Sequence, residues 1–288
     1  MALLENKVVV VTGAGRGLGA VYARRLAAEG AAIVVNDVGR DAQGVASAEQ
    51  VAASIRDNGG RAVAHTEDIS TVVGGQSLLQ CALDHFGRVD ILVNNAGILR
   101  DKSFAKMDEA DWDAVQQVNF KSLYTVTRPI FSWMKDNGGG GVIVNTSSVS
   151  GIVGNFGQTN YGASKAGVWG FSHVLALEGA KFGVRVWTLA PAATSALTAG
   201  LMSEAMQKEL APEHVAEVLL YMVSDLSGTR TGHTIFASGQ SIRELKLLSS
   251  EGIPGARGGA PISAQAIATN EGRLYREEPA LTIMDFSQ

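Results

Sequence analysis

Short apolar runs rich in valine and isoleucine alternate along the chain with longer stretches in which apolar and polar residues are mixed. Uninterrupted apolar runs of this length, bounded by turn residues, are typical of strands that are buried on both faces of a parallel sheet. They predict strands at residues 7–12, 31–36, 61–65, 89–94, 141–147, 184–190 and 233–238, the run at 233–238 being the last.

The mixed stretches between these runs have the spacing of amphipathic helices. They predict helices at residues 19–30, 48–57, 78–86, 109–134, 161–179 and 211–223, the last with Pro212 near its start. Strands that alternate with helices indicate a parallel sheet with helices on both faces. The predicted fold class is therefore α/β, a Rossmann-like doubly wound parallel sheet in a single domain.

The pattern weakens towards the end of the chain. Residues 1–250 are predicted to form the domain, and residues 251–288 a C-terminal extension that begins with the Gly/Pro-rich stretch "EGIPGARGGAP". This extension either packs on a neighbouring subunit or is disordered, and the sequence leaves both interpretations open.

Composition narrows the class of protein. The chain has 288 residues, of which 46% are hydrophobic and 18% charged, as in ordinary globular proteins. A net charge of -4 and the lack of a basic run argue against nucleic-acid binding. No apolar run is long enough to cross a membrane, and no leader peptide is evident. Cys81 is the single cysteine, which excludes an internal disulfide, so we expect a cytoplasmic protein.

A glycine-rich turn joins the first predicted strand to the first helix. In "VTGAGRGLGA", Gly13, Gly17 and Gly19 stand where the backbone turns sharply and can approach a ligand closely. Backbone N–H groups at the start of the following helix favour an anion such as a pyrophosphate. Because a strand and a helix flank the motif, it predicts a dinucleotide site.

Charged residues near this turn bear on which dinucleotide binds. Asp37 ends the second strand, where a carboxylate accepts hydrogen bonds from the ribose hydroxyls of NAD and repels a 2′-phosphate. Arg16 and Arg40 favour NADP instead, since either can pair with that phosphate. Asp37 is expected to lie nearer to the ribose than either arginine, so the sequence favours NAD over NADP. Asp68, after the third strand, either accepts the adenine amino group or is a turn carboxylate.

A second set of residues carries proton-transfer chemistry. Tyr161 and Lys165 are four residues apart in "NYGASKAG", so on a helix they lie on one face. A tyrosine has a pKa of about 10, and an adjacent ammonium lowers it towards the range of a general base. Ser148 ends the fifth strand, thirteen residues before Tyr161 (161 minus 148). The histidines show no metal-ligand spacing, and we expect no metal.

Together these motifs, which run from Lys7 to about Ser238, resemble the short-chain dehydrogenase/reductase family. The resemblance implies that Tyr161 is the base and that Lys165 assists it and binds the nicotinamide ribose. It selects Ser148 rather than Ser147 to hold the substrate oxygen, so that Ser148 and Tyr161 contact the substrate. Asn119 would anchor a water that links Lys165 to solvent, although it can also cap or kink its helix.

The resemblance also implies a set of cofactor contacts. The family usually has Pro-Gly after the sixth strand, where this chain has Pro191-Ala192, a departure that leaves the path of that loop open and does not affect the expected cofactor. The expected NAD-binding residues are Gly13, Gly15, Arg16, Gly17, Leu18, Gly19, Asp37, Asp68, Ile69, Asn95, Ala96, Gly97, Tyr161, Lys165, Pro191, Ala193 and Thr194.

Longer stretches point to a narrower group. "VVNDVG", "NNAGILRDKSF" and "GNFGQTNYGASKAG" are similar to the (3R)-hydroxyacyl-CoA dehydrogenase part of peroxisomal multifunctional enzymes. The similarity implies an NAD-dependent oxidation of a 3-hydroxyacyl-CoA or a 17β-hydroxysteroid, with residues 194–210 covering the substrate. An NADPH-dependent 3-oxoacyl reductase and a non-catalytic dinucleotide-binding regulator are the alternatives. The family resemblance also implies a tetramer or dimer built on the helices at 109–134 and 161–179.

Overall fold

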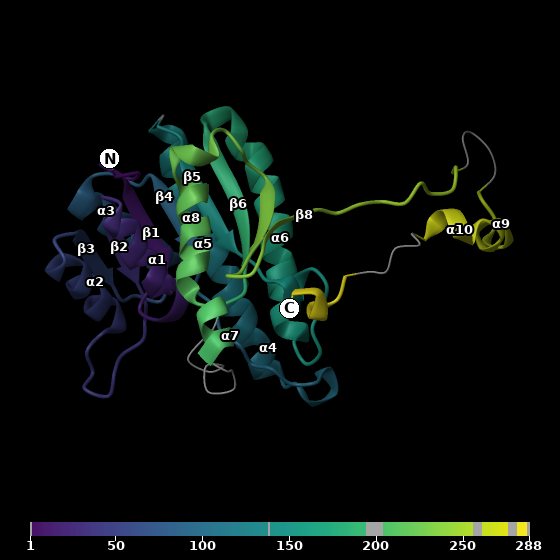
Figure 1. Ribbon diagram of the computed structural model, residues 1–288, viewed down its shortest axis with the longest axis horizontal. Coiled ribbons are helices and arrows are strands. Elements are labelled where there is room, and N and C mark those ends of the chain that lie inside the picture. The colour runs from purple at the N-terminus through teal and green to yellow at the C-terminus, as the bar shows by residue number, and fades with distance from the viewer. Residues whose placement is uncertain (1, 138, 194–203, 256–260, 276–280, 287–288) are drawn as a thin grey trace.

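A twisted sheet forms the centre of the protein (Figure 1), whose structure is a computed structural model that describes residues 2–137, 139–193, 204–255, 261–275 and 281–286. In the described residues the sheet has the strand order β3-β2-β1-β4-β5-β6-β7-β8. All neighbours pair in parallel except β8, which is antiparallel to β7. The strands are β1 (Val8–Thr12), β2 (Ala32–Asn36), β3 (Arg61–His65), β4 (Ile91–Asn94), β5 (Gly141–Thr146), β6 (Val184–Pro191), β7 (His233–Ala237) and β8 (Ile242–Leu245).

Helices cover both faces of the sheet. One layer holds α1 (Gly17–Ala28), α2 (Ser47–Asp57) and α8 (Pro212–Val223). The other holds α3 (Val72–Phe86), α5 (Ser122–Asp136) and α6 (Thr159–Gly179), with α4 (Glu109–Gln116) and the π-helix η2 (Gln117–Lys121) leading into α5. The predicted doubly wound α/β fold is confirmed.

Alternate strand residues supply the two cores. Val9 and Val11 of β1 pack with the α1, α2 and α8 layer, and Val10 packs with the α3, α5 and α6 layer. Because each strand is buried on both sides, it has no polar face, which explains the continuous valine runs in the sequence.

Two sequence expectations were wrong in detail. The strand at 233–238 is not the last, because β8 follows it at the edge of the sheet. Ile242, Arg243 and Glu244 of β8 are exposed, so this strand carries the charged residues that protect sheet edges and lacks an apolar run. The helix expected over 109–134 is interrupted by η2.

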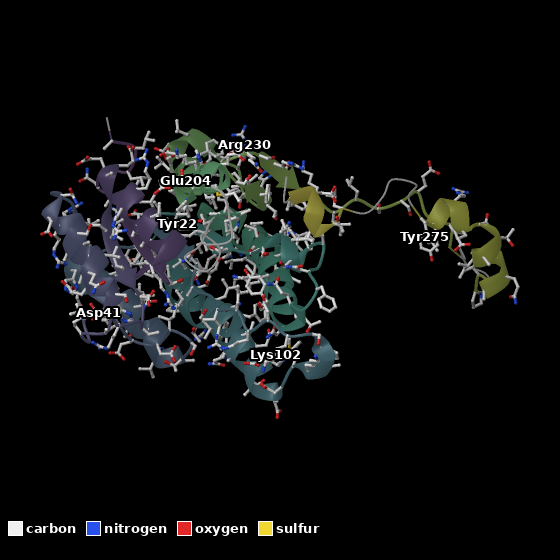
Figure 2. All side chains as sticks on the ribbon, turned by 60° about the horizontal axis from the view of Figure 1, so that its bottom comes forward. Tyr22, Asp41, Lys102, Glu204, Arg230 and Tyr275 are labelled. Atoms are coloured by element: carbon white, nitrogen blue, oxygen red, sulfur yellow. The ribbon has the colours of Figure 1, made fainter. Side chains whose placement is uncertain are left out.

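The C-terminal extension leaves the body after β8. Figure 1 shows α9 (Ala264–Thr269) and α10 (Glu271–Leu274) on an arm apart from the sheet, and the last turn, η7 (Ile283–Phe286), back on the body. Tyr275, at the end of α10, lies far from the core in Figure 2. The remaining short elements are α7 (Glu204–Glu209), η1 (Phe104–Lys106), η3 (Val149–Gly151), η4 (Ala180–Phe182) and η6 (Asp225–Ser227).

The order of strands determines where a ligand can enter. β1 lies between β2 and β4, so the chain runs outward in opposite directions from β1 and leaves a crevice at the carboxyl ends of β1 and β4. Such a reversal is where doubly wound sheets bind their ligands.

Candidate active site

A cavity of about 330 Å³ opens at this crevice. It is bounded by the turns that follow β1, β2, β3 and β4, by η2 and the start of α5, and by one residue after β6. Its lining residues are Gly13, Arg16, Gly17, Leu18, Gly19, Asn36, Asp37, Val38, Asp68, Ile69, Ser70, Asn95, Ala96, Gly97, Ile98, Val118, Ser122 and Ala193.

The glycine turn between β1 and α1 needs its glycines for space. A Cβ atom on Gly19 would lie 2.2 Å from the carbonyl oxygen of Gly13, and one on Gly13 would lie 2.7 Å from the Cα of Ala96. Gly17 has a φ of +53° and nothing within 4 Å of a built Cβ, so its backbone faces open space. The turn is therefore open at Gly17 and tightly packed against neighbouring backbone at Gly13 and Gly19.

The amino end of α1 carries uncompensated positive charge. Its N-cap residue, Arg16, makes no side-chain capping bond, and no acidic residue lies in the first turn. Free N–H groups at a helix start, together with the helix dipole, favour an anion at this point. The residues present thus fit the pyrophosphate of a dinucleotide.

Asp37 lies beside the glycine turn in the cavity wall, and both of its carboxylate oxygens accept hydrogen bonds from the backbone. Oδ2 accepts from the N–H of Gly15 at 3.0 Å and Oδ1 from the N–H of Gly39 at 2.7 Å. Arg16 lines the cavity beside it. Arg40 is exposed and donates to the carbonyl oxygen of Gly44 at 3.0 Å. The negative charge is therefore fixed in the cavity wall, and one of the two candidate arginines lies in that wall.

Asp68 is a turn carboxylate that also lines the cavity, and its contact with adenine stays a prediction. Its Oδ1 accepts from the N–H of Ser70 at 2.9 Å, as a turn carboxylate does, and the residue also lines the cavity. Ile69 and Ser70 line the cavity beside it and are buried.

Thr12 fixes the turn after β4. Its Oγ1 accepts from the N–H groups of Asn95 at 3.0 Å and Ala96 at 3.1 Å. The Asn95 side chain donates in return to the carbonyl oxygen of Thr12 at 3.0 Å. Gly97 then faces the catalytic candidates, because a Cβ on it would lie 3.6 Å from Nζ of Lys165.

Tyr161 and Lys165 lie on α6 one turn apart, as expected. Nζ of Lys165 is 5.6 Å from the centre of the Tyr161 ring and donates to the carbonyl oxygen of Thr146 at 2.7 Å. Burial lowers the pKa of Lys165 to about 8. Burial raises the pKa of Tyr161, the hydrogen bond with Ser148 lowers it, and the Asp101 carboxylate raises it. In the protein alone burial dominates, so the lowering expected from Lys165 is not seen.

Ser148 follows β5, and its side chain reaches two partners. It forms a hydrogen bond with the Tyr161 side chain, and its Oγ accepts from the N–H of Ser150 at 3.2 Å. The neighbouring Ser147 is buried and donates to the carbonyl oxygen of Lys165 at 2.7 Å. Ser147 thus ties β5 to α6, while the Ser148 hydroxyl meets the phenol.

Asn119 joins η2 to the loop after β4. Its Oδ1 accepts from the N–H of Ile98 at 2.8 Å, and its Nδ2 donates to the carbonyl oxygen of Ile98 at 3.1 Å. A further contact of 3.4 Å reaches Oγ of Ser164 on α6. Short π-helical segments inside α-helices are frequent at functional sites. Here the π-helix η2 brings the buried side-chain amide of Asn119 to the carboxyl edge of the sheet.

The structure gathers most of the predicted residues but not all. The cavity lining does not include Gly15, Asn119, Ser148, Tyr161, Lys165 or Pro191. Asn119 and Lys165 come close to it, because a Cβ on Gly97 would lie 3.4 Å from Oδ1 of Asn119 and 3.6 Å from Nζ of Lys165. Thr194 lies outside the described residues, as does most of the expected substrate cover at 194–210. The sequence interpretation missed the lining residues Asn36, Val38, Ser70, Ile98, Val118 and Ser122, which adjoin predicted site residues in the chain or lie one helical turn away.

Two features are absent from the described part of the chain. It holds no cluster of three or more His, Cys, Asp or Glu side chains that could bind a metal ion. Within the same ranges, every helix is too short or too polar to traverse a lipid bilayer. Nδ1 of His173 donates a hydrogen bond to the carbonyl oxygen of Trp169 at 2.9 Å.

Comparison with known proteins agrees with this geometry. A sequence model of the short chain dehydrogenase family matches residues 7–216. A short-chain type dehydrogenase/reductase of Mycobacterium tuberculosis is 42% identical over 92% of each chain. The peroxisomal multifunctional enzyme type 2 of Mus musculus is 43% identical over 76% of this chain and 30% of its own length. A crystal structure of a short chain dehydrogenase from Mycobacterium avium superimposes with a TM-score of 0.85 and 33% identity, covering 95% and 97% of the two chains.

Proposed function

Because the chain belongs to the short-chain dehydrogenase/reductase family, we propose that it is an NAD-dependent dehydrogenase that oxidises a secondary alcohol to a ketone. The observation that carries the proposal is the meeting of Ser148, Tyr161 and Lys165 next to a cavity suited to a dinucleotide. Bound NAD would supply the hydride acceptor for the reaction.

The chain's own groups would handle the proton. Tyr161, as a phenolate, removes the proton from the substrate hydroxyl, and Ser148 donates a hydrogen bond to the same oxygen as its carbonyl forms. Lys165, positioned by the Thr146 carbonyl, supplies positive charge that favours the phenolate. Asn119 would anchor the water that carries the proton from Lys165 towards solvent. Their catalytic roles stay predictions until variants are measured.

Asp37 supports NAD over NADP. Its carboxylate is held by two backbone N–H groups in the cavity wall, where it would accept from ribose hydroxyls and repel a 2′-phosphate. The relevant substitution is Asp37→Asn, because the amide oxygen can still accept from Gly15 or Gly39 while the charge is lost. We expect the preference for NAD over NADP to fall at least about tenfold. Asp41→Asn, in the same loop but outside the cavity lining, is the matched control.

The substrate class rests on likeness to relatives. The mouse relative is named a peroxisomal multifunctional enzyme, and this chain spans 30% of its length. Together with the resemblance of residues 94–104 and 154–167 to (3R)-hydroxyacyl-CoA dehydrogenases, this supports a 3-hydroxyacyl-CoA, with a 17β-hydroxysteroid as the alternative. Arg16 in the cavity wall favours a second candidate function, the NADPH-dependent reduction of a 3-oxoacyl thioester.

A panel assay separates these functions. Purified protein is mixed with NAD or NADP and with (3R)- and (3S)-hydroxyacyl-CoAs of several lengths or a 17β-hydroxysteroid, and formation of the reduced nicotinamide is followed by absorbance. The reverse assay uses 3-oxoacyl thioesters with NADH or NADPH. Turnover of one hydroxyacyl enantiomer with NAD supports the proposal, and turnover with NADPH alone supports the reductase. Binding of NADH without turnover of any alcohol would leave a non-catalytic regulator.

We also propose that the protein is a homo-oligomer. Helices α4, α5 and α6 and the turn η2 surround a hollow of about 750 Å³ on the outer face, lined in part by Phe120, Tyr124 and Phe171. Tyr124 is 44% exposed, a high value for a large apolar side chain. The arm also carries exposed apolar side chains, and its packing on a neighbouring subunit belongs to the same proposal. A cytoplasmic location stays a prediction.

A further inference from the structure

The C-terminal turn η7 closes a small hydrophobic cluster at the carboxyl edge of the sheet. Its buried members come from four separate segments, namely Val149 of η3, Ala190 of β6, Phe236 of β7 and Phe286 of η7. Partly buried side chains of β8 and of the segments after η3 and β6 pack around them. Figure 1 shows the chain returning to this place after the arm.

Specific contacts attach η7 to the body. The rings of Phe286 and Phe236 meet edge to face, with centroids 4.9 Å apart and planes inclined at 63°. The Arg243 guanidinium lies 6.0 Å from one ring centre and 5.9 Å from the other, and its Nη1 is 3.5 Å from the carbonyl oxygen of Asp285. The Asp285 carboxylate accepts from the backbone N–H of Thr282 at 2.7 Å and thereby stabilises the turn itself.

The same cluster supports the backbone next to Ser148. Val149 follows Ser148 directly, and η3 is in contact with η7. On its other side η3 presses against α6, because a Cβ on Gly151 would lie 2.5 Å from the backbone nitrogen of Ala166. The turn η3 is therefore held between a catalytic helix and the C-terminal segment.

We propose that Phe286 is a positioning residue for Ser148: by packing on Val149 it holds η3 against α6 and keeps the Ser148 hydroxyl directed at the substrate oxygen. The inference rests on the role given to Ser148 under the proposed function. A three-residue 3₁₀ turn has poor internal hydrogen-bond geometry and depends on what packs against it. Removing a buried phenyl ring leaves a cavity that such a turn can move into.

Hydrogen exchange tests the packing without any substrate. In Phe286→Ala, the backbone N–H groups of Gly151, Ile152 and Val153, which donate to Ser148 and Val149, are expected to exchange about tenfold faster or more. Leu281→Ala is the matched control, because this leucine lies just before η7 and is 53% exposed. Unchanged exchange in Phe286→Ala, with NADH binding retained, would refute the proposed packing role.

Kinetics test the positioning role. With the substrate identified by the panel assay, Phe286→Ala is expected to lower kcat by ten- to a hundredfold while the KM for NAD stays within about twofold. Phe286→Leu, which refills most of the volume, is expected to restore kcat, and Leu281→Ala to leave it unchanged. A fall in kcat that Phe286→Leu does not restore, or a kcat equal to wild type in Phe286→Ala, would overturn the proposal.

The two failures can be told apart. If Ser148→Ala turns over substrate as fast as wild type, the proposed function is wrong, while faster exchange in Phe286→Ala would still show that η7 holds η3. If Ser148→Ala is inactive and Phe286→Ala has normal kcat and exchange, the positioning role of Phe286 is wrong and the proposed function stands.

Discussion

Three of the four candidate catalytic side chains, those of Lys165, Asn119 and Ser148, form hydrogen bonds with backbone atoms. Lys165 donates to the carbonyl oxygen of Thr146, Asn119 holds both polar groups of Ile98, and the Ser148 hydroxyl accepts from a backbone N–H. Backbone atoms do not change rotamer, so the fold itself fixes these contacts before any ligand binds. Lys165 is 3% exposed, so its ammonium group loses its hydration on folding and its pKa is lowered.

The buried lysine predicts a pH-dependent stability. Its pKa falls from 10.5 to about 8 on folding, so between these values the unfolded chain binds the proton more tightly than the folded one. Stability contributed by this group therefore rises as the pH rises through that window. Lys165→Met removes a burial cost with an upper limit of roughly 3 kcal/mol near neutrality, reduced by loss of the bond to Thr146.

Urea unfolding of Lys165→Met and wild type across this window measures the effect. We expect the variant to be the more stable near neutrality, with a difference that shrinks as the pH approaches 10.5. A difference that stays constant with pH would mean that Lys165 is not desolvated in the folded protein.

Tyr161 carries the sharpest activity prediction. Tyr161→Phe removes the phenol that would take the proton, and we expect kcat/KM for the alcohol to fall by about a hundred- to ten-thousandfold with NADH affinity nearly unchanged. Tyr22→Phe is the matched control, because its hydroxyl is buried away from the cavity and has no hydrogen-bond partner within the described residues. That variant should keep full activity. Full activity in Tyr161→Phe would contradict the mechanism.

At the scale of elements, local patterns predicted the buried strands well and the irregular pieces poorly. The helix α3 begins at Val72, six residues before the expected start, because Thr71 accepts from the N–H of Gly74 and caps a stretch of poor helix formers. The strand β8 is short and exposed, and it forms through antiparallel pairing with β7 and not from a local apolar pattern. The π-turn η2 follows from packing against α6 and the loop after β4, which no local pattern encodes.

The candidate site was more predictable than these elements. Its residues follow the carboxyl ends of β1, β2, β4 and β5, and parallel strands bring those ends to one edge. The sequence therefore predicts that Asp37, Asn95 and Ser148 lie along the same edge of the sheet. The sequence could not show that the Ser147 hydroxyl donates to the Lys165 carbonyl oxygen, or that burial raises the pKa of Tyr161. Both effects depend on distances between residues of different elements.

The turn between β1 and α1 gives an element-scale prediction. In Gly19→Ala the new Cβ would meet the Gly13 carbonyl oxygen at 2.2 Å, so the turn must open and its N–H groups lose their arrangement. We expect NADH affinity to fall at least about tenfold and the melting temperature to drop by several degrees. Gly170→Ala on α6, where a Cβ meets nothing within 4 Å, should bind NADH normally. Fluorescence titration and thermal melts would decide, and equal affinities would exclude a tight cradle at Gly19.

At the scale of the whole molecule, contacts distant in sequence decide what the extension does. Phe286 packs on Phe236, fifty positions earlier in the chain (286 minus 236). The described part of the arm between β8 and η7 carries exposed apolar side chains, and α9 and α10 contain no buried residue. Ile267, Leu274 and Tyr275 are 38%, 38% and 64% exposed, more than a stable helical pair in water would leave uncovered. The weak periodicity of residues 251–288 indicated an extension and gave no sign of the return to β7.

The hollow formed by α4, α5 and α6 gives the molecular-scale prediction. If a second copy covers it, Tyr124→Asp places an unpaired carboxylate in a desolvated interface, a cost of several kcal/mol per subunit. We expect wild type to be a dimer or tetramer at micromolar concentration by light scattering and Tyr124→Asp to dissociate. Leu226→Asp, on the 60% exposed η6 leucine that follows α8 in the opposite layer, should leave the assembly intact. Because Phe120 and Lys121 join this hollow to the turn that carries Asn119, dissociation should also lower kcat. A monomeric wild type would contradict the proposed oligomer. An assembly that neither substitution changes would mean that the interface lies elsewhere on the protein.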